Sequence, residues 1–168
     1  FKTTAPTYIE NSTIYANGGK GTNGGLAEIT AGAGTTCVAN GGAGGNSGSG
    51  NVTGYFVSMK NVIINASSGV PGAGGNAINA EAEGTTNPGN GGSGAGISGY
   101  FNNLYGGTTY FENVSINANG IKGGNAGTCT GGGGGTGGQG GTGSRGFFIS
   151  NSTTFNMVRA NISSDSGI

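Results

Sequence analysis

Several stretches of the chain alternate between apolar and polar residues, and one of these stretches recurs. YIENSTIYANG at residues 8–18 and YFENVSINANG at residues 110–120 match without a gap at Tyr, Glu, Asn, Ile, Ala, Asn and Gly. SMKNVIINASS at residues 58–68 keeps the same central frame, and NMVRANIS at residues 156–163 is a weaker fourth copy. Such recurrence indicates an internal repeat in which one structural unit is used several times.

The recurring stretch has the two-residue period of a β-strand. When Asn11, Asn61, Asn113 and Met157 are taken as equivalent, the residues one, three and five positions later are almost all apolar: Ser12, Ile14, Ala16, Val62, Ile64, Ala66, Val114, Ile116, Ala118, Val158, Ala160 and Ile162. The residues between them are mostly polar. The pattern therefore predicts strands with one buried face and one solvated face.

A second signature, a glycine followed by two aromatic residues, stands upstream of three copies. It reads Gly54-Tyr55-Phe56, Gly99-Tyr100-Phe101 and Gly146-Phe147-Phe148, and we interpret Phe1 as the remnant of a further copy. Because a pair accompanies each repeat, core filling is favoured over a sugar-stacking role. Each unit is thus expected to contain an aromatic strand, a short turn, a second strand and a long glycine-rich arm.

The glycine-rich arms have a spacing of their own. Glycines recur every third residue in four runs, which are 18/21/24, 42/45/48, 69/72/75 and 132/135/138/141. Three residues is the repeat of the polyproline II helix. The tips at residues 24–37 and 74–87 share Gly-Gly-X-Ala and Gly-Thr-Thr at identical spacing, and residues 123–129 read as a shortened third tip. This shared register favours ordered arms, held by backbone hydrogen bonds, over the flexible linkers that glycine-rich sequence usually forms.

We therefore predict an all-β chain with a parallel β-solenoid-like core of three and a half units and long, ordered, polyglycine-II-like arms. Stacked copies would each cover the apolar face that a single copy cannot bury alone. We expect one repeat domain over residues 1–168, with units at approximately 1–54, 55–99 and 100–146 and a terminal half unit at 147–168.

Composition and charge exclude several classes of partner. The chain has 43 glycines among 168 residues, 7% charged residues and a formal net charge of zero. The six basic residues are spread singly, at Lys2, Lys20, Lys60, Lys122, Arg145 and Arg159. This distribution provides no electrostatic footprint for nucleic acid or an anionic membrane. No apolar run approaches the roughly 18 residues of a membrane span, so none is expected.

The remaining signals favour a secreted, extracellular or cell-surface protein. Six Asn-X-Ser/Thr sequons are candidate glycosylation sites, at Asn11, Asn51, Asn65, Asn113, Asn151 and Asn161. The start at Phe1 is interpreted as that of a mature secreted form. Two cysteines suit an oxidising compartment. Cys37 and Cys129 each follow a Gly-Thr element at positions expected to be repeat-equivalent, with Asn87 in the middle copy. We expect a disulfide between them, either within one chain or between chains.

Catalysis and metal binding are not expected. The chain has no histidine, which excludes a Ser-His-Asp triad, and two cysteines cannot close a tetrahedral zinc site. Residues 19–24 fit G-x-G-x-x-G, but such matches arise by chance at this glycine content. Glu81 and Glu83 are interpreted as solvated charges at an arm tip. We therefore predict a non-enzymatic protein without catalytic residues, metal ligands or a cofactor.

The combination of NVSINANG-type strands, Gly-Gly-X runs and abundant sequons resembles glycine-rich parallel β-helix and adhesin-like surface proteins of the archaeal type. The arms also resemble those of polyglycine-II proteins, which include a small arthropod antifreeze protein and some phage tail-fibre adhesins. The resemblance covers nearly the whole chain and rests on composition and repeat style. It implies an extracellular structural role.

Two function classes follow. In the first, the protein is a structural subunit of an extracellular filament or surface sheath, which assembles head to tail with copies of itself and carries covalent N-glycans. In the second, it is an adhesin that binds a receptor, or an ice-binding module, and its arms form the binding surface. The apparently incomplete ends favour the first class, because unpaired strand edges template further strand pairing.

Overall fold

The computed structural model describes residues 1–29, 37–79, 84–87, 97–131 and 138–167, and this part of the chain contains strands and no helix. The all-β prediction is therefore confirmed. The strands are β1 (Lys2–Tyr15), β2 (Ala27–Ile29), β3 (Cys37–Asn40), β4 (Gly50–Asn65), β5 (Ala77–Asn79), β6 (Gly84–Asn87), β7 (Ile97–Asn103), β8 (Thr108–Asn117), β9 (Cys129–Thr130), β10 (Arg145–Ser150), β11 (Thr154–Val158) and β12 (Asn161–Ser163).

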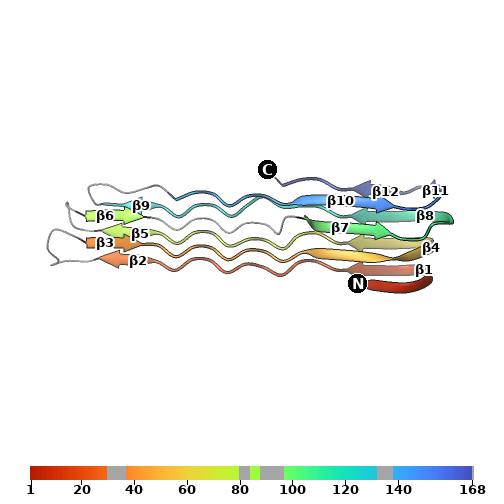
Figure 1. Ribbon diagram of the computed structural model, residues 1–168, viewed down its shortest axis with the longest axis horizontal. Coiled ribbons are helices and arrows are strands. Elements are labelled where there is room, and N and C mark those ends of the chain that lie inside the picture. The colour runs from red at the N-terminus through yellow and green to blue at the C-terminus, as the bar shows by residue number, and fades with distance from the viewer. Residues whose placement is uncertain (30–36, 80–83, 88–96, 132–137, 168) are drawn as a thin grey trace.

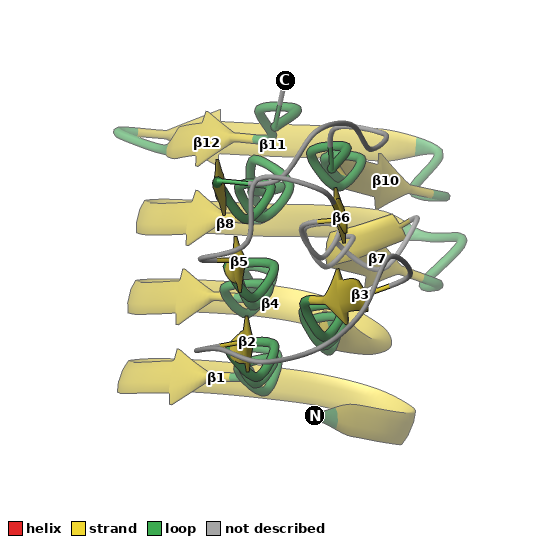
Figure 2. Cartoon of the chain, turned by 90° about the vertical axis from the view of Figure 1, so that its left-hand side faces the viewer, coloured by secondary structure: helices red, strands yellow, loops and turns green. Residues whose placement is uncertain are grey.

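The principal element is a curled parallel sheet, a half-barrel of seven strands. Its order is β10-β7-β4-β8-β11, with β1 also paired to β4 and β12 to β8. The sheet has four levels: β1 is level 1, β4 is level 2, β7 with β8 is level 3, and β10 to β12 form level 4. Each level bends back on itself, so that β7 and β8 run in opposite directions in Figure 1. Viewed end-on, the curled levels lie one above another (Figure 2).

The second half of each level carries the predicted buried face. Val62 lies opposite Ser12 on one side and Val114 on the other, and Ile64 lies opposite Ile14 and Ile116 in the same way. The side chains of Val62, Ile64, Val114 and Ile116 are almost completely buried. The period-two interpretation is confirmed for levels 2 and 3, where a neighbouring level covers each strand on both sides.

The predicted frame of the fourth copy is wrong. Met157 lies opposite Phe111 instead of Asn113, and Val158 lies opposite Glu112 with 56% of its surface exposed. Ile162, opposite Ile116, supplies the apolar contact at level 4. The two-residue alternation is interrupted at Arg159, whose φ of 52° is in the left-handed region, so an alternating pattern cannot be carried through it.

Phenylalanine rings fill the interior of the curl. Phe56 and Phe101 are fully buried, and the rings of Phe1, Phe56, Phe101 and Phe148 stack with successive centroid distances of 6.5, 5.4 and 5.2 Å. Phe155 packs edge-on against the ring of Phe111 at 4.8 Å. One aromatic residue of each predicted pair therefore belongs to this stack, and Phe1 extends the stack to level 1.

Outside the sheet, glycine-rich segments leave each level and return to the next. We call residues 16–26, 66–76, 118–128 and 164–167 the outgoing segments, and residues 41–49 and 138–144 the returning segments. They appear as long wavy traces in Figure 1 and as coils seen end-on in Figure 2.

Backbone hydrogen bonds join these segments at every third residue. The N–H groups of Gly18, Gly21 and Gly24 donate to the carbonyl oxygens of Ser67, Val70 and Ala73, at 2.8–3.0 Å. The N–H groups of Gly42, Gly45 and Gly48 donate to Gly25, Thr22 and Gly19, and those of Gly69, Gly72 and Gly75 donate to Gly48, Gly45 and Gly42. Each donor glycine thus lies where a neighbouring backbone approaches closely.

The register at the tips differs from the sequence alignment. Ala27 lies opposite Ala77 as expected, but Cys37 lies opposite Gly84 and Asn40 opposite Asn87. Cys129 in turn lies opposite Ala77, three residues later than the Gly-Gly-Asn-Ala match predicts. The hydrogen bonds repeat every three residues, so a shift of three residues leaves them all formed. The same shift means that identical residues of the aligned tips no longer lie opposite one another.

Candidate interaction surface

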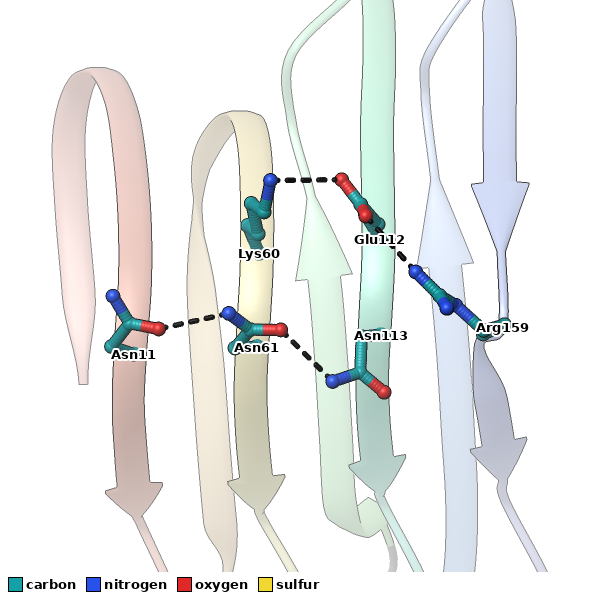
Figure 3. A network of polar contacts seen from close by, with 6 residues as sticks. All are labelled: Asn11, Lys60, Asn61, Glu112, Asn113 and Arg159. Atoms are coloured by element: carbon teal, nitrogen blue, oxygen red, sulfur yellow. Dashed lines mark hydrogen bonds and ion pairs between the residues drawn. The ribbon is translucent and has the colours of Figure 1, made fainter.

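The outer face of the second half of each level carries rows of identical or complementary side chains. Asn11, Asn61 and Asn113 occupy equivalent positions with φ angles of 48°, 53° and 54°. Asparagine tolerates this left-handed conformation better than most residues. The Nδ2 atom of Asn113 donates to Oδ1 of Asn61, and Nδ2 of Asn61 donates to Oδ1 of Asn11, both at 2.9 Å (Figure 3). We call these three residues the asparagine ladder.

A row of charged residues lies beside the asparagine ladder, and at levels 1 to 3 each member comes one residue before the ladder asparagine. Glu10 is opposite Lys60, and Lys60 is opposite Glu112. The Nζ atom of Lys60 is 3.3 Å from Oε2 of Glu112, and the guanidinium of Arg159 is 3.1 Å from Oε1 of the same carboxylate (Figure 3). We call Glu10, Lys60, Glu112 and Arg159 the charge row. Each of the two ion pairs is solvent-exposed and is therefore worth only about 0–1 kcal/mol.

Arg159 connects the two rows. It follows Val158, the level 4 partner of Glu112, and takes the left-handed conformation that asparagine has at the three earlier levels. A long charged side chain thus replaces the fourth amide at the last level.

The sheet has an open edge at each end of the stack. Among the described residues, β1 is hydrogen-bonded to β4 alone, β10 to β7 alone, and β11 and β12 to β8 alone. We call β1 the first edge, and β10 to β12 the last edge. Both edges expose large hydrophobic side chains, including Tyr8 at the first and Met157 and Val158 at the last, and Phe1, which directly precedes β1, is exposed as well. Unpaired edges of this kind are templates for further strand pairing.

A shallow groove of about 470 Å³ crosses levels 2 to 4 on the outer face. It is lined by Asn61, Ile63, Asn113, Ser115, Arg159 and Asn161, together with Val62 and Val114. A second groove, of about 380 Å³, runs over the outgoing segments and is lined in part by Lys20, Asn23, Pro71, Lys122 and Asn125. Amide and cationic groups dominate the polar lining of both.

The sequon asparagines are at the surface. Asn11, Asn51, Asn113, Asn151 and Asn161 are exposed, and Asn65 is half-buried. Asn65 also accepts a hydrogen bond at 2.9 Å from Nδ2 of Asn117. The side chains of Asn11 and Asn113 belong to the asparagine ladder, so a glycan there would replace one N–H of a ladder amide. Glycosylation of all six residues stays a prediction.

The two cysteines are not at equivalent positions. Cys37 starts β3, which pairs with β6, whereas Cys129 starts β9, which extends the separate sheet of β2 and β5. The expected equivalence of Cys37, Asn87 and Cys129 is therefore wrong, because Cys129 stands at the end of an outgoing segment. The side chain of Cys129 is exposed. The disulfide itself stays a prediction.

Two further expectations concern catalysis and membranes. Glu81 and Glu83 lie outside the described residues. Over the described ranges, no group of three or more His, Cys, Asp and Glu side chains is arranged to hold a metal ion. The same ranges contain no helix of the length and apolarity needed to span a membrane.

Comparisons with known proteins identify no relative. No protein-family model matches the chain, and no curated protein or solved structure matches it either. Its function must therefore be argued from the surface described above.

The sequence contained a signal for this surface. Glu10 and Glu112 occupy matching positions of the two most similar repeat copies, but the alternation of charge is seen only when Lys60 and Arg159 are placed in the same row. Lys60 precedes Asn61 as Glu10 precedes Asn11, so its place was visible. The place of Arg159 was not, because arginine gives no indication of a left-handed residue.

Proposed function

We propose that the protein is a non-enzymatic structural subunit of an extracellular filament or surface sheath, and that it assembles head to tail through the edges of its curled sheet. The observation that carries this proposal is the pair of open parallel edges, one at each end of the four-level stack. Levels of a parallel sheet are related by translation, so the outer side of the last edge matches the first edge of a second copy.

In this proposal the chain is a parallel β-solenoid of repeated units with polyglycine-II-like arms. Hydrogen bonds donated by a glycine at every third residue support the polyglycine-II description of the arms. Equivalent residues 50 to 52 positions apart, such as Ser12, Val62 and Val114, support the repeated unit. A solenoid whose terminal repeats lack polar caps is prone to end-to-end association.

Low charge favours the same assembly. The chain has a formal net charge of zero, so copies repel one another little when they approach. A second copy stacked on the last edge would add four levels of about 4.8 Å each, or roughly 19 Å of axial length per subunit. Head-to-tail contacts of this type generate open filaments, unless the rotation from one copy to the next brings the copies round into a closed ring.

We also propose that the protein is secreted and is similar in role to adhesin-like surface proteins. Exposed sequon asparagines are compatible with N-glycans that point away from the buried face. These glycans would hydrate an otherwise weakly charged surface. A disulfide between Cys37 and Cys129, within or between chains, would suit the same compartment.

A proline in the first edge tests the proposed contact. The N–H of Ala16 donates to Asn65 of level 2, so by the alternation of a strand the N–H of Tyr15 points away from the sheet. Proline is tolerated at such an edge position but cannot donate to a docking strand. We expect Tyr15→Pro to remain folded by circular dichroism and to lose assembly in sedimentation velocity, whereas Tyr15→Ala retains assembly. Wild-type protein that sediments as a monomer at every concentration would overturn the proposal.

The groove over the outgoing segments favours a second candidate, a binding module whose arms recognise a receptor, a glycan or ice. Its lining brings Lys20, Asn23, Lys122 and Asn125 to one surface. A monomeric protein that binds a glycan array, or that produces thermal hysteresis, and that loses this activity in Asn23→Leu, would support this candidate. Absence of both activities would reject it.

A further inference from the structure

The charge row has a direction along the stack. Its members alternate in sign from level 1 to level 4, as Glu10, Lys60, Glu112 and Arg159, so it begins with an anion at the first edge and ends with a cation at the last edge. The two outer members are thus opposite in charge and belong to opposite edges.

Within one copy, Glu10, the first member of the charge row, forms no ion pair with a described side chain. Lys60 and Arg159 each contact one carboxylate oxygen of Glu112. Among the described residues, these two contacts are the ion pairs formed between side chains. Glu10 takes part in neither of them. Glu10 is exposed on a strand whose outer side has no neighbour.

Arg159 can serve a second partner. Its guanidinium carries five N–H donors, and one nitrogen, NH2, contacts Glu112. It stands at the outermost level with 72% of its side chain exposed. It also has a left-handed backbone, an uncommon conformation for a residue that is neither glycine nor asparagine. The repeat imposes this conformation at all four levels, and at level 4 it carries a long cationic side chain in place of an amide.

We propose that Arg159 of one copy pairs with Glu10 of the next copy, and that this ion pair sets the polarity and register of the filament. The inference rests on the proposed head-to-tail assembly and specifies its contact. Stacking by translation would place Glu10 of the next copy opposite Val158, as Glu112 is opposite Val158 within one copy. Arg159 would then reach Glu10 from the neighbouring position, as it reaches Glu112 within its own copy. Joining two first edges would instead bring together two strands that both carry Glu10, and directly opposed like charges are destabilising.

Charge reversal tests the pair in three steps. Glu10→Lys alone creates a cation–cation joint, and Arg159→Glu alone creates an anion–anion joint. We expect each single variant to raise the critical concentration for assembly roughly tenfold or more at low salt, since like charges at an interface cost several kcal/mol. The double variant, with both substitutions in one chain, restores opposite charges and should assemble at close to the wild-type concentration.

Mixing the two single variants is the sharper measurement. In an equimolar mixture every joint between unlike copies carries opposite charges, so the mixture should pellet although neither variant does so alone. Lys122→Glu, which changes net charge as Arg159→Glu does but lies on an outgoing segment, should assemble as wild type. In about 1 M salt, where the Debye length is about 3 Å, the differences among variants should shrink.

The outcomes separate the contact from the function. If the wild type and both single variants assemble alike, the Arg159–Glu10 pair is wrong and the filament proposal stands. If the mixture stays soluble while each variant keeps the wild-type circular dichroism spectrum, the pair is also wrong. If the wild type itself remains monomeric at all concentrations, the proposed function fails and this inference fails with it.

Discussion

A methyl group added to a donor glycine distinguishes an ordered bundle of arms from flexible linkers. Gly21 lies where three segments meet, and a Cβ atom at this position would collide with the carbonyl oxygen of Gly45 and lie 2.8 Å from the amide nitrogen of Gly72. Gly19, two residues earlier in the same segment, has nothing within 4 Å of its Cβ position. The two residues are therefore a matched pair for substitution by alanine.

The expected effects of the two substitutions have opposite signs. For Gly21→Ala, overpacking costs about 1–3 kcal/mol. The added methyl group would also disturb two backbone hydrogen bonds, from the N–H of Gly45 to Thr22 and from the N–H of Gly72 to Gly45. Weakening each bond should cost at most about 1 kcal/mol more. Gly19→Ala instead restricts the unfolded chain and should stabilise by about 0.4–1 kcal/mol, since Gly19 has no positive φ.

Thermal unfolding followed by circular dichroism measures both effects. At about 2–4 °C per kcal/mol for a chain of this size, we expect Gly21→Ala to lower Tm by roughly 5–15 °C and Gly19→Ala to raise it slightly. Equal small shifts for the two variants would refute the close approach of the segments, because a flexible linker would not distinguish Gly21 from Gly19.

Other predictions concern the ladder, the core and the covalent modifications. Asn61→Ala should destabilise the fold by about 1–2 kcal/mol in urea titrations, because alanine is strained at a φ of 53°, and Asn61→Gly should cost less. Phe101→Ala removes a fully buried ring from the aromatic stack and should cost about 3–5 kcal/mol in the same titration. On non-reducing gels, a disulfide between Cys37 and Cys129 should give either a faster monomer or a ladder, whereas two alkylatable thiols would exclude it. Intact mass from the native host should exceed 16.0 kDa if the sequons are occupied, and an unmodified mass would reject glycosylation.

The strands of the sheet were predictable because their environment is simple. At levels 2 and 3 each strand has a neighbour on both sides, so the alternation of Val114 and Ile116 with polar residues reports burial directly. The stacking of levels followed from the recurrence of this pattern. The aromatic pairs were predicted to fill the core, and Phe56 and Phe101 do so, whereas Tyr55, the first member of its pair, is exposed.

The register of level 4 and of the tips was not predictable, for two physical reasons. A left-handed residue interrupts a two-residue period, and at Arg159 no asparagine or glycine marked its place. In the glycine segments, hydrogen bonding depends on a spacing of three and hardly on side-chain identity, so a slip of three residues costs little. The tip alignments that placed Cys37 with Asn87 and Cys129 were of this kind.

The curl of each level was likewise absent from the alternation pattern. The two halves of a level enclose the phenylalanine stack. At level 3, for example, Phe101 of β7 contacts Phe111 of β8, and these two strands are close in sequence but run in opposite directions. The charge row depends on this placement too, because its members are neighbours only when four levels are in register. Sequence alone supplied the equivalence of Glu10 and Glu112, and the structure supplied the alternation.

Diffraction from oriented, concentrated protein tests head-to-tail assembly most directly. The account predicts unbranched filaments with a reflection near 4.8 Å along the filament axis, from the spacing of levels, and a subunit repeat of roughly 19 Å along the same axis. Filaments that show the 4.8 Å spacing perpendicular to their axis, or protein that forms no filaments at any concentration, would contradict assembly through the strand edges.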